Sequence, residues 1–156
     1  MACTLCSIDA STKSTGISVF KNGKYFSSTL IQCSDKIMDE RFKKMSDSIL
    51  LFLEDNQPNV IYMEEAVVIR NAQTQRFLVR LQGVVYAWSI LNNAECNFIR
   101  PSEWRSLAGL KIGKKKRDEL KKEAINLVKE KMNIDVNDDV AESILIGTAA
   151  LNKFED

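Results

Sequence analysis

Acidic residues stand at three points of the chain where a strand ends or a helix begins. Asp9 ends an otherwise uncharged segment, and Glu64 and Glu65 close an apolar one. Asp139 and Glu142 are three residues apart, so both can face one side of the first turn of a final helix. The chain contains no histidine, which excludes Ser-His and Cys-His catalysis and a histidine general base. Hydrolytic chemistry would therefore depend on carboxylates, lysine, tyrosine or cysteine.

Each acid also has a purely structural interpretation. Asp9 could form a turn with its own backbone, one acid of the 64–65 pair could be solvated, and acids at a helix N-terminus cap it and favour its dipole. Taken together, Asp9, Glu64, Asp139 and Glu142 could instead meet in one small volume, where carboxylates raise one another's pKa. A divalent cation relieves that repulsion, and oxygen ligands favour Mg²⁺ or Mn²⁺. Two such ions ~3.5–4 Å apart can activate water for phosphodiester hydrolysis.

The elements that must position these acids follow from the pattern of apolar residues. Strands are predicted at 4–9, 16–20, 25–31, 60–64 and 95–99, with a type I′ hairpin turn at Asn22-Gly23. Helices are predicted at about 35–55, 72–91, 114–132 and 140–153, the first capped by Ser34. Pro101 is expected to end the last strand. Strands alternating with helices predict an α/β fold, a mixed five-stranded sheet with helices on both faces.

Composition places the chain in one domain. Its 156 residues, 45% hydrophobic and 28% charged, suit a single domain spanning 1–156. No apolar run approaches the ~20 residues of a membrane helix, and we expect no secretory signal and a cytoplasmic location. Cys3 and Cys6 have zinc-knuckle spacing, but no second close pair follows and a strand would point them to opposite faces. Buried, reduced thiols are the better interpretation of the cysteines.

A formal net charge of +1 hides an uneven distribution of charge. Residues 100–131 carry 11 basic and 5 acidic groups, and residues 132–156 carry 1 basic and 6 acidic groups. A basic segment before an acidic one indicates a polyanion-binding patch beside a carboxylate cluster. The alternative is a lysine-rich helix that is simply solvated.

These motifs, in this order, resemble the RuvC family of Holliday-junction resolvases, which have the ribonuclease H-like fold. The family's opening pattern, Ile-Asp-x-Gly-x-x-x-Thr-Gly, is similar to residues 8–16. Its second acid, followed by Asn-Ala and a helix, corresponds to Glu64 with Asn71-Ala72. Its final Asp-x-x-Asp-Ala-like pattern is similar to residues 139–142. The similarity spans nearly the whole chain, and the short length suggests a phage-encoded member.

The resemblance implies a Mg²⁺-dependent, structure-selective DNA endonuclease that resolves Holliday junctions by paired nicks. Mn²⁺ would substitute for Mg²⁺, two ions are expected per site, and Asp9, Glu64, Asp139 and Glu142 would be both catalytic residues and metal ligands. The partners implied are branched DNA, four-way junctions above all, and a second copy of the chain.

Three residues depart from the family's pattern: Ser11 replaces a Gly, Glu142 an Asp, and Val67 a frequent aromatic residue. The family places three steps between its two helix acids, which selects Asp139 rather than its neighbour Asp138 as the ligand. Asp138 is then expected to lie at the N-cap of the last helix.

Basic residues near these motifs would bind the DNA backbone. Neutralised phosphates give affinity that is independent of sequence and sensitive to salt. The predicted DNA-binding residues are Lys13, Arg70, Arg76, Lys111, Lys114, Lys115, Lys116, Arg117 and Lys121. Trp104, within the same region, is interpreted as a core residue rather than a base-stacking one.

The helix predicted at 72–91 is apolar on more than one side. Phe77, Leu81, Val84 and Trp88 form one stripe, and a second face favours a dimer partner, unless neighbouring helices cover it. Other functions also stay open: a ribonuclease H-like enzyme that processes RNA, or a non-catalytic module that binds branched DNA. Residues 9–16 also resemble the first phosphate loop of an ATP-binding domain of the actin-like or sugar-kinase type. The chain is too short for that two-lobed fold.

Overall fold

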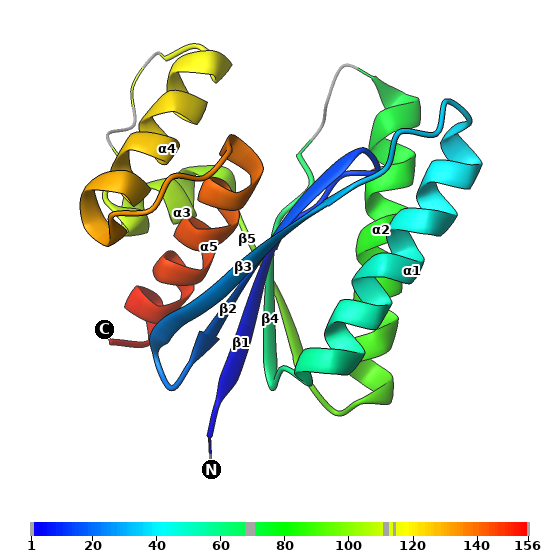
Figure 1. Cartoon of the computed structure of the whole chain (residues 1–156), viewed down its shortest axis with the longest axis horizontal. Coiled ribbons are helices and arrows are strands. Elements are labelled where there is room, and N and C mark those ends of the chain that lie inside the picture. Colours follow the sequence, from blue (N-terminus) through cyan, green and yellow to red (C-terminus); the bar gives the residue numbers. More distant parts are fainter. Residues whose placement is uncertain (1, 68–70, 111–112, 114, 156) are drawn as a thin grey trace.

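The computed structural model describes residues 2–67, 71–110, 113 and 115–155. Its centre is a mixed sheet with the strand order β3-β2-β1-β4-β5 (Figure 1). The strands are β1 (Thr4–Asp9), β2 (Ser14–Lys21), β3 (Lys24–Gln32), β4 (Val60–Glu64) and β5 (Glu95–Ile99). β1, β4 and β5 are parallel, whereas β2 is antiparallel to β1 and β3. The predicted mixed five-stranded sheet is therefore confirmed.

A tight hairpin joins β2 to β3. Its two central residues, Asn22 and Gly23, have φ values of 51° and 77°. A type I′ turn requires positive φ at both positions, and Asn-Gly tolerates this better than other pairs. The hairpin predicted from these two residues is confirmed.

Helices cover both faces of the sheet (Figure 1). α1 (Met38–Asn56) and α2 (Ala72–Leu91) lie on one face, and α3 (Pro101–Ala108), α4 (Arg117–Met132) and α5 (Asp138–Glu155) lie on the other. Residues of β1 and β4 alternate between two cores: Leu5 and Tyr62 belong to the core beneath α3–α5, and Ile8 and Met63 to the core beneath α1 and α2. The same alternation directs Asp9 and Glu64 toward α5.

α5 approaches the sheet closely at two glycines. A Cβ on Gly147 would lie 2.2 Å from the ring of Phe20 and 2.7 Å from Ser7 Oγ. A Cβ on Gly16, in β2, would lie 2.2 Å from the carbonyl oxygen of Asp139. Only glycine fits these two positions, so the first turn of α5 rests directly on β2 beside the end of β1.

Four of the five helices differ from the prediction, among them α4, which begins at Arg117 rather than at about 114. α1 begins at Met38 with Ile37 at its N-cap and no side-chain cap, so the prediction that Ser34 caps this helix is wrong. α3 was not predicted, since Pro101 begins a helix as well as ending β5. α5 begins at Asp138 rather than Val140.

No helix within the described ranges combines the length and apolar character needed to cross a membrane.

Candidate active site

Asp9 and Glu64 end two neighbouring parallel strands. Ile8 of β1 pairs with Met63 of β4, so the acids that follow them close the strands side by side. Both side chains are partly buried and face the side of the sheet that α5 covers. The carboxyl ends of parallel strands are a usual place for ligands in α/β folds.

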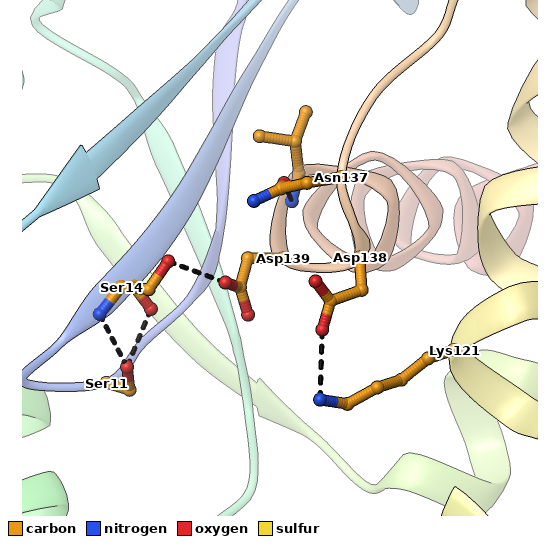
Figure 2. Close-up of polar contacts among 7 residues, drawn as sticks. Ser11, Ser14, Lys121, Asn137, Asp138 and Asp139 are labelled. Carbon is orange, nitrogen blue, oxygen red and sulfur yellow. Dashed lines mark hydrogen bonds and ion pairs between the residues drawn. The ribbon is translucent and has the colours of Figure 1, made fainter. Parts of the chain in front are cut away.

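Asp139 and Glu142 reach the same place from the first turn of α5. Asn137 caps this helix, since its Oδ1 accepts a hydrogen bond from the N–H of Val140 at 2.9 Å. Ser14, at the start of β2, donates its hydroxyl to Asp139 Oδ2 at 2.6 Å, as Figure 2 shows. The hydroxyl and the close approach at Gly16 together fix the position of Asp139.

Electrostatic interactions link the four predicted acids. Burial is the main reason that the pKa of Asp9 lies well above its ordinary value, and repulsion by Glu142, Glu64 and Asp139 raises it further. The pKa of Glu142 is also raised, first by burial and then by Glu64, despite a hydrogen bond with Asp9 that lowers it. The structure therefore places Glu64, Asp139 and Glu142 close enough to Asp9 for the charge of each to raise its pKa.

Three side chains offset part of this charge at Glu64. Trp104, fully buried in α3, donates its indole N–H to Glu64 Oε2 at 2.7 Å. Arg105 and Arg117 lower the pKa of Glu64 through their charge, and Arg105 does the same for Glu142. Burial outweighs them, and the pKa of Glu64 is raised.

The donor set fits a hard divalent cation. Among the described residues, no group of three or more acid, cysteine or histidine side chains stands in ligating positions. The chemistry of the four groups is nevertheless that of a Mg²⁺ or Mn²⁺ site, because clustered carboxylates supply oxygen ligands. The raised pKa of Asp9 reflects a repulsion that a cation would relieve.

The loop after Asp9 is closed by hydroxyl groups, not by Asp9. Ser11 Oγ donates to the carbonyl of Ser14 at 2.6 Å and accepts its N–H at 3.0 Å, and Thr15 Oγ1 donates to the carbonyl of Ser11 at 2.8 Å. Ser11, where the RuvC pattern has glycine, thus has a role of its own here. The charges of Glu142, Glu64 and Asp139 act on the Asp9 carboxylate, which favours the functional interpretation of this residue over the turn-forming one.

Asp138 has a different partner from its neighbour Asp139. Figure 2 shows its carboxylate pointing toward α4, where Lys121 Nζ lies 3.0 Å from Asp138 Oδ2. The expectation that Asp138 caps the last helix is wrong, because Asn137 supplies the capping oxygen. Asp138 instead joins α4 to α5.

The predicted DNA-binding residues divide into three groups. Lys121 pairs with Asp138 and Lys115 with Glu123, so both are engaged within the protein. Four others are exposed: Lys13, Arg76, Lys116 and Arg117. Arg70, Lys111 and Lys114 lie outside the described residues.

The cysteines are free thiols in different surroundings. Cys6 is buried in β1, which raises the pKa of its thiol to about 12, and burial raises the pKa of Cys96 to about 11. Cys3 is exposed, so the prediction that the thiols are buried is wrong for this residue. Val67, in place of the aromatic residue frequent in the RuvC family, is 51% exposed.

Sequence reasoning missed Ser14, Arg105 and the bond made by Trp104. Ser14 lies in a stretch of small polar residues whose direction becomes definite only once the loop is folded. Trp104 and Arg105 belong to the unpredicted α3, which has two recognisable signals: Pro101 in its first turn, and Gly109 with a φ of 92° just after its end.

The fold is the ribonuclease H-like fold of RuvC-type Holliday junction resolvases. The structure matches Thermus thermophilus RuvC in complex with a Holliday junction substrate with a TM-score of 0.76 and 13% identity over 98% of this chain and 96% of that one. Fowlpox virus resolvase, solved with Holliday junction DNA, matches with 0.71 and 14% over 98% and 99%. The yeast mitochondrial Holliday junction resolvase matches with 0.62 and 18% over 95% and 77%.

The chain belongs to the family described as Lactococcus phage M3 protein, whose model matches residues 1–150. The family's description agrees with the phage origin expected from the sequence. No curated protein matches the chain significantly.

Proposed function

We propose that this chain is a divalent-metal-dependent, structure-selective DNA endonuclease that resolves four-way junctions by paired nicks. The observation that carries the proposal is the convergence of Asp9, Glu64, Asp139 and Glu142 at one sheet edge of a RuvC-type fold. Two of the similar structures, T. thermophilus RuvC and fowlpox virus resolvase, were solved with Holliday junctions, which supports the same substrate here.

The four acids would hold Mg²⁺, or Mn²⁺ in its place, and four carboxylates suffice for two ions. When bound, such ions would lower the pKa of a water molecule so that hydroxide could attack the phosphodiester, and they would stabilise the leaving oxygen, giving 5′-phosphate and 3′-hydroxyl ends. The chain itself supplies the fixed positions: Ser14 orients Asp139, and Asn137 secures the first turn of α5. Arg105 offsets negative charge at Glu64 and Glu142.

The DNA backbone would bind to exposed cations around this edge. Arg117 lies close enough to lower the pKa of Glu64, so its charge reaches the site. Lys13 and Lys116 are exposed on the loop after β1 and just before α4. The roles of Arg70, Lys111 and Lys114 stay predictions from the sequence.

We also propose that two copies pair through α2 and β5, since two opposed strands must be cut. Leu81, Val85 and Trp88 of α2 are buried in the chain's own core. Other apolar side chains of this region are exposed: Val79 at 50%, Tyr86 at 48%, Ile90 at 69%, Leu91 at 85% and Phe98 at 36%. Tyr86 contacts Phe98 edge-to-face, with ring centroids 6.2 Å apart, so these residues form one surface across the helix and the edge strand.

Two adjacent acids allow a matched test of the site. Glu64→Gln should abolish cleavage of labelled four-way junctions in Mg²⁺ while junction binding survives, and Glu65→Gln, a change of the same kind next to it, should cut normally. Forks, linear duplexes and RNA duplexes in the same assay separate a junction resolvase from an RNA-processing nuclease. Normal cutting by Glu64→Gln would refute the site.

The DNA surface is tested by salt dependence. Changing Lys116 and Arg117 to alanine should weaken junction binding and lower the slope of log affinity against log salt by ~0.9 for each phosphate that the protein no longer neutralises. Changing Lys43 and Lys44, two exposed lysines of α1, removes the same charge from the opposite face and serves as the control. Equal slopes for the two double variants would mean that Lys116 and Arg117 do not touch DNA.

The dimer is tested by sedimentation. Ile90→Glu should convert the dimer to a monomer, whereas Leu51→Glu, a residue of α1 with a similar exposed fraction of 63%, should not. A wild-type chain that sediments as a monomer at micromolar concentration, both free and on a junction, would exclude this pairing.

A further inference from the structure

Trp104 makes a directed contact with one candidate metal ligand. It is 0% exposed, and its Nε1–H donates to Glu64 Oε2 at 2.7 Å. An indole has one polar atom, which only donates, so this bond has one possible sense. The bond engages one carboxylate oxygen of Glu64 and does not use the other.

The backbone around this contact is fixed on both sides. Glu64 pairs with Ile99 across β4 and β5, and the N–H of Glu65 donates to the carbonyl of Ile99 at 2.8 Å. α3 begins two residues after Ile99, and the N–H of Trp104 donates to the carbonyl of Arg100 at 3.0 Å in its first turn. The indole is therefore held at a set distance from the end of β4.

The chain's other tryptophan provides a comparison. The sequence has two tryptophans, and Trp88 of α2 also donates its Nε1–H to a glutamate, Glu54 Oε1 of α1, at 2.6 Å. Trp88 is 5% exposed, so the two indoles are alike in burial and in bonding. They differ in the partner, because Glu54 is an exposed residue on the opposite face and Glu64 lies among the converging acids.

We propose that Trp104 is a positioning residue that holds the Glu64 carboxylate in the orientation required for metal binding. The charge of Glu64 raises the pKa of Asp9 and of Glu142, so Glu64 lies within reach of both acids, and the Trp104 N–H fixes one of its carboxylate oxygens there. Hydrogen-bond partners of metal ligands commonly account for 10–100-fold in metal affinity or activity. This inference rests on the proposed function, because it presumes that Glu64 binds a divalent cation.

The wild-type chain can be tested directly by NMR. A ¹H–¹⁵N spectrum should contain two indole cross-peaks, which Trp88→Phe assigns. Titration with Mg²⁺ at constant ionic strength should move the Trp104 peak in a saturable manner and leave the Trp88 peak in place. In Glu64→Gln the Trp104 peak should no longer respond.

Two matched variants measure the size of the effect. Trp104→Phe removes the N–H and keeps an aromatic ring. It should raise by ~10–100-fold both the Mg²⁺ concentration for half-maximal junction cleavage and the Mg²⁺ dissociation constant measured by calorimetry. Trp88→Phe makes the same chemical change on the opposite face, and should leave both values within about twofold of wild type. Cleavage by Trp104→Phe should recover as Mg²⁺ is increased, which a merely misfolded site would not do.

The outcomes separate this inference from the proposed function. A wild-type chain that neither binds Mg²⁺ nor cuts junctions would overturn the proposed function itself. If the wild-type chain binds Mg²⁺ and cuts junctions, two results would overturn only the role of Trp104. One is a Trp104 peak that does not move with Mg²⁺. The other is a Trp104→Phe variant with the same Mg²⁺ dependence as Trp88→Phe. If Trp104→Phe does not fold, the titration of the wild-type peaks decides.

Discussion

The two faces of the sheet are built from the same strands but have opposite character. On the face under α1 and α2, the fully buried side chains of the central strands are apolar except Thr15: Cys6, Ile8, Ile17, Val19, Ile61 and Met63. On the face under α5, the alternating positions include buried hydroxyl groups. Ser7 Oγ donates to the carbonyl of Ser143 at 2.5 Å, and Ser18 Oγ lies 2.6 Å from Ser143 Oγ. This row of serines leads toward the end of β1, where the acids converge.

The two faces contribute differently to the stability of the fold: the apolar face stabilises it, and the acid cluster on the other face destabilises it. An apolar face needs only shape and volume, because burial itself stabilises it. A polar face needs a partner for every buried group, and an unpaired one costs ~1–3 kcal/mol. The hydrogen bonds made by the acids do not offset the cost of burying their carboxylates, since the pKa values of Asp9, Glu64 and Glu142 remain raised. The acid cluster thus destabilises the face that carries it, which a structural interpretation alone would not explain.

The largest expected effect comes from removing one charge on the polar face. Asp9→Asn should abolish junction cleavage and, in the metal-free protein at neutral pH, raise the melting temperature, because it removes a buried charge that three acids repel. Asp47→Asn, at an exposed position of α1, should change neither property. Cleavage rates and thermal melts of the two variants, with and without Mg²⁺, give the comparison. A less stable Asp9→Asn would show that Asp9 has a structural role.

The next effect tests how closely α5 must approach the sheet. Gly16→Ala places a methyl group 2.2 Å from the carbonyl oxygen of Asp139, and overpacking of this kind costs ~1–3 kcal/mol. The shifted first turn should also reduce cleavage. Gly83→Ala, in α2, has no atom within 4 Å of the new Cβ and should instead stabilise by ~0.8–1.0 kcal/mol. Chemical denaturation measures the stability of both variants. Equal changes in their free energy of unfolding would contradict the difference expected between the two positions.

The polar face should also make stability depend on pH. The folded chain holds protons on Asp9 and Glu142 at pH values where the unfolded chain, with ordinary values of 3.8 and 4.5, has lost them. The free energy of unfolding of the metal-free protein should therefore fall as pH rises from about 4 toward the raised folded-state pKa values. Mg²⁺ should reverse the fall at neutral pH, and Asp9→Asn should flatten it. Melting temperatures across pH 4–8 that rise steadily without metal would contradict this.

The sequence predicted the sheet well because strands follow a local pattern, and the roles of the four acids stay predictions. Strand alternation placed Asp9 and Glu64 at strand ends, and the bounds of β1, β4, β5 and α2 agree with the predicted ranges. Four acids at strand and helix ends, in a chain without histidine, indicated from the sequence that they could converge. The resemblance to the RuvC pattern selected Asp139 rather than Asp138 as the ligand, and in the structure Asp139 accepts a hydrogen bond from Ser14 whereas Asp138 pairs with Lys121.

The failures concern contacts between residues distant in the chain. The ion pair of Lys121 with Asp138 was not predicted, and the DNA-binding role of Lys121 stays a prediction. Trp104 reads as a core residue, and only the packing of α3 shows that its N–H meets Glu64. Such pairings depend on tertiary distance, which spacing along the chain does not encode.

The smallest expected effects distinguish two neighbours at the start of α5. Asn137 accepts the N–H of Val140, so Asn137→Ala should cost ~0.5–2 kcal/mol of unfolding free energy, the usual cost of losing a helix cap. Asp138 pairs with Lys121, and both side chains are about a third exposed, so Asp138→Asn should cost at most ~1 kcal/mol.

Cleavage should separate these neighbours from Asp139. Asp138→Asn leaves the hydrogen bond between Ser14 and Asp139 in place and should cut junctions at close to the wild-type rate. Asn137→Ala removes the cap of the turn that carries Asp139 and Glu142. The nicking rate should therefore fall by more than the smaller folded fraction of this variant explains. Denaturation curves and Mg²⁺-dependent nicking rates of the two variants test both statements. An inactive Asp138→Asn with normal stability would instead move the metal ligand from Asp139 to Asp138, and Lys121 would then belong to the active site rather than to the link between α4 and α5.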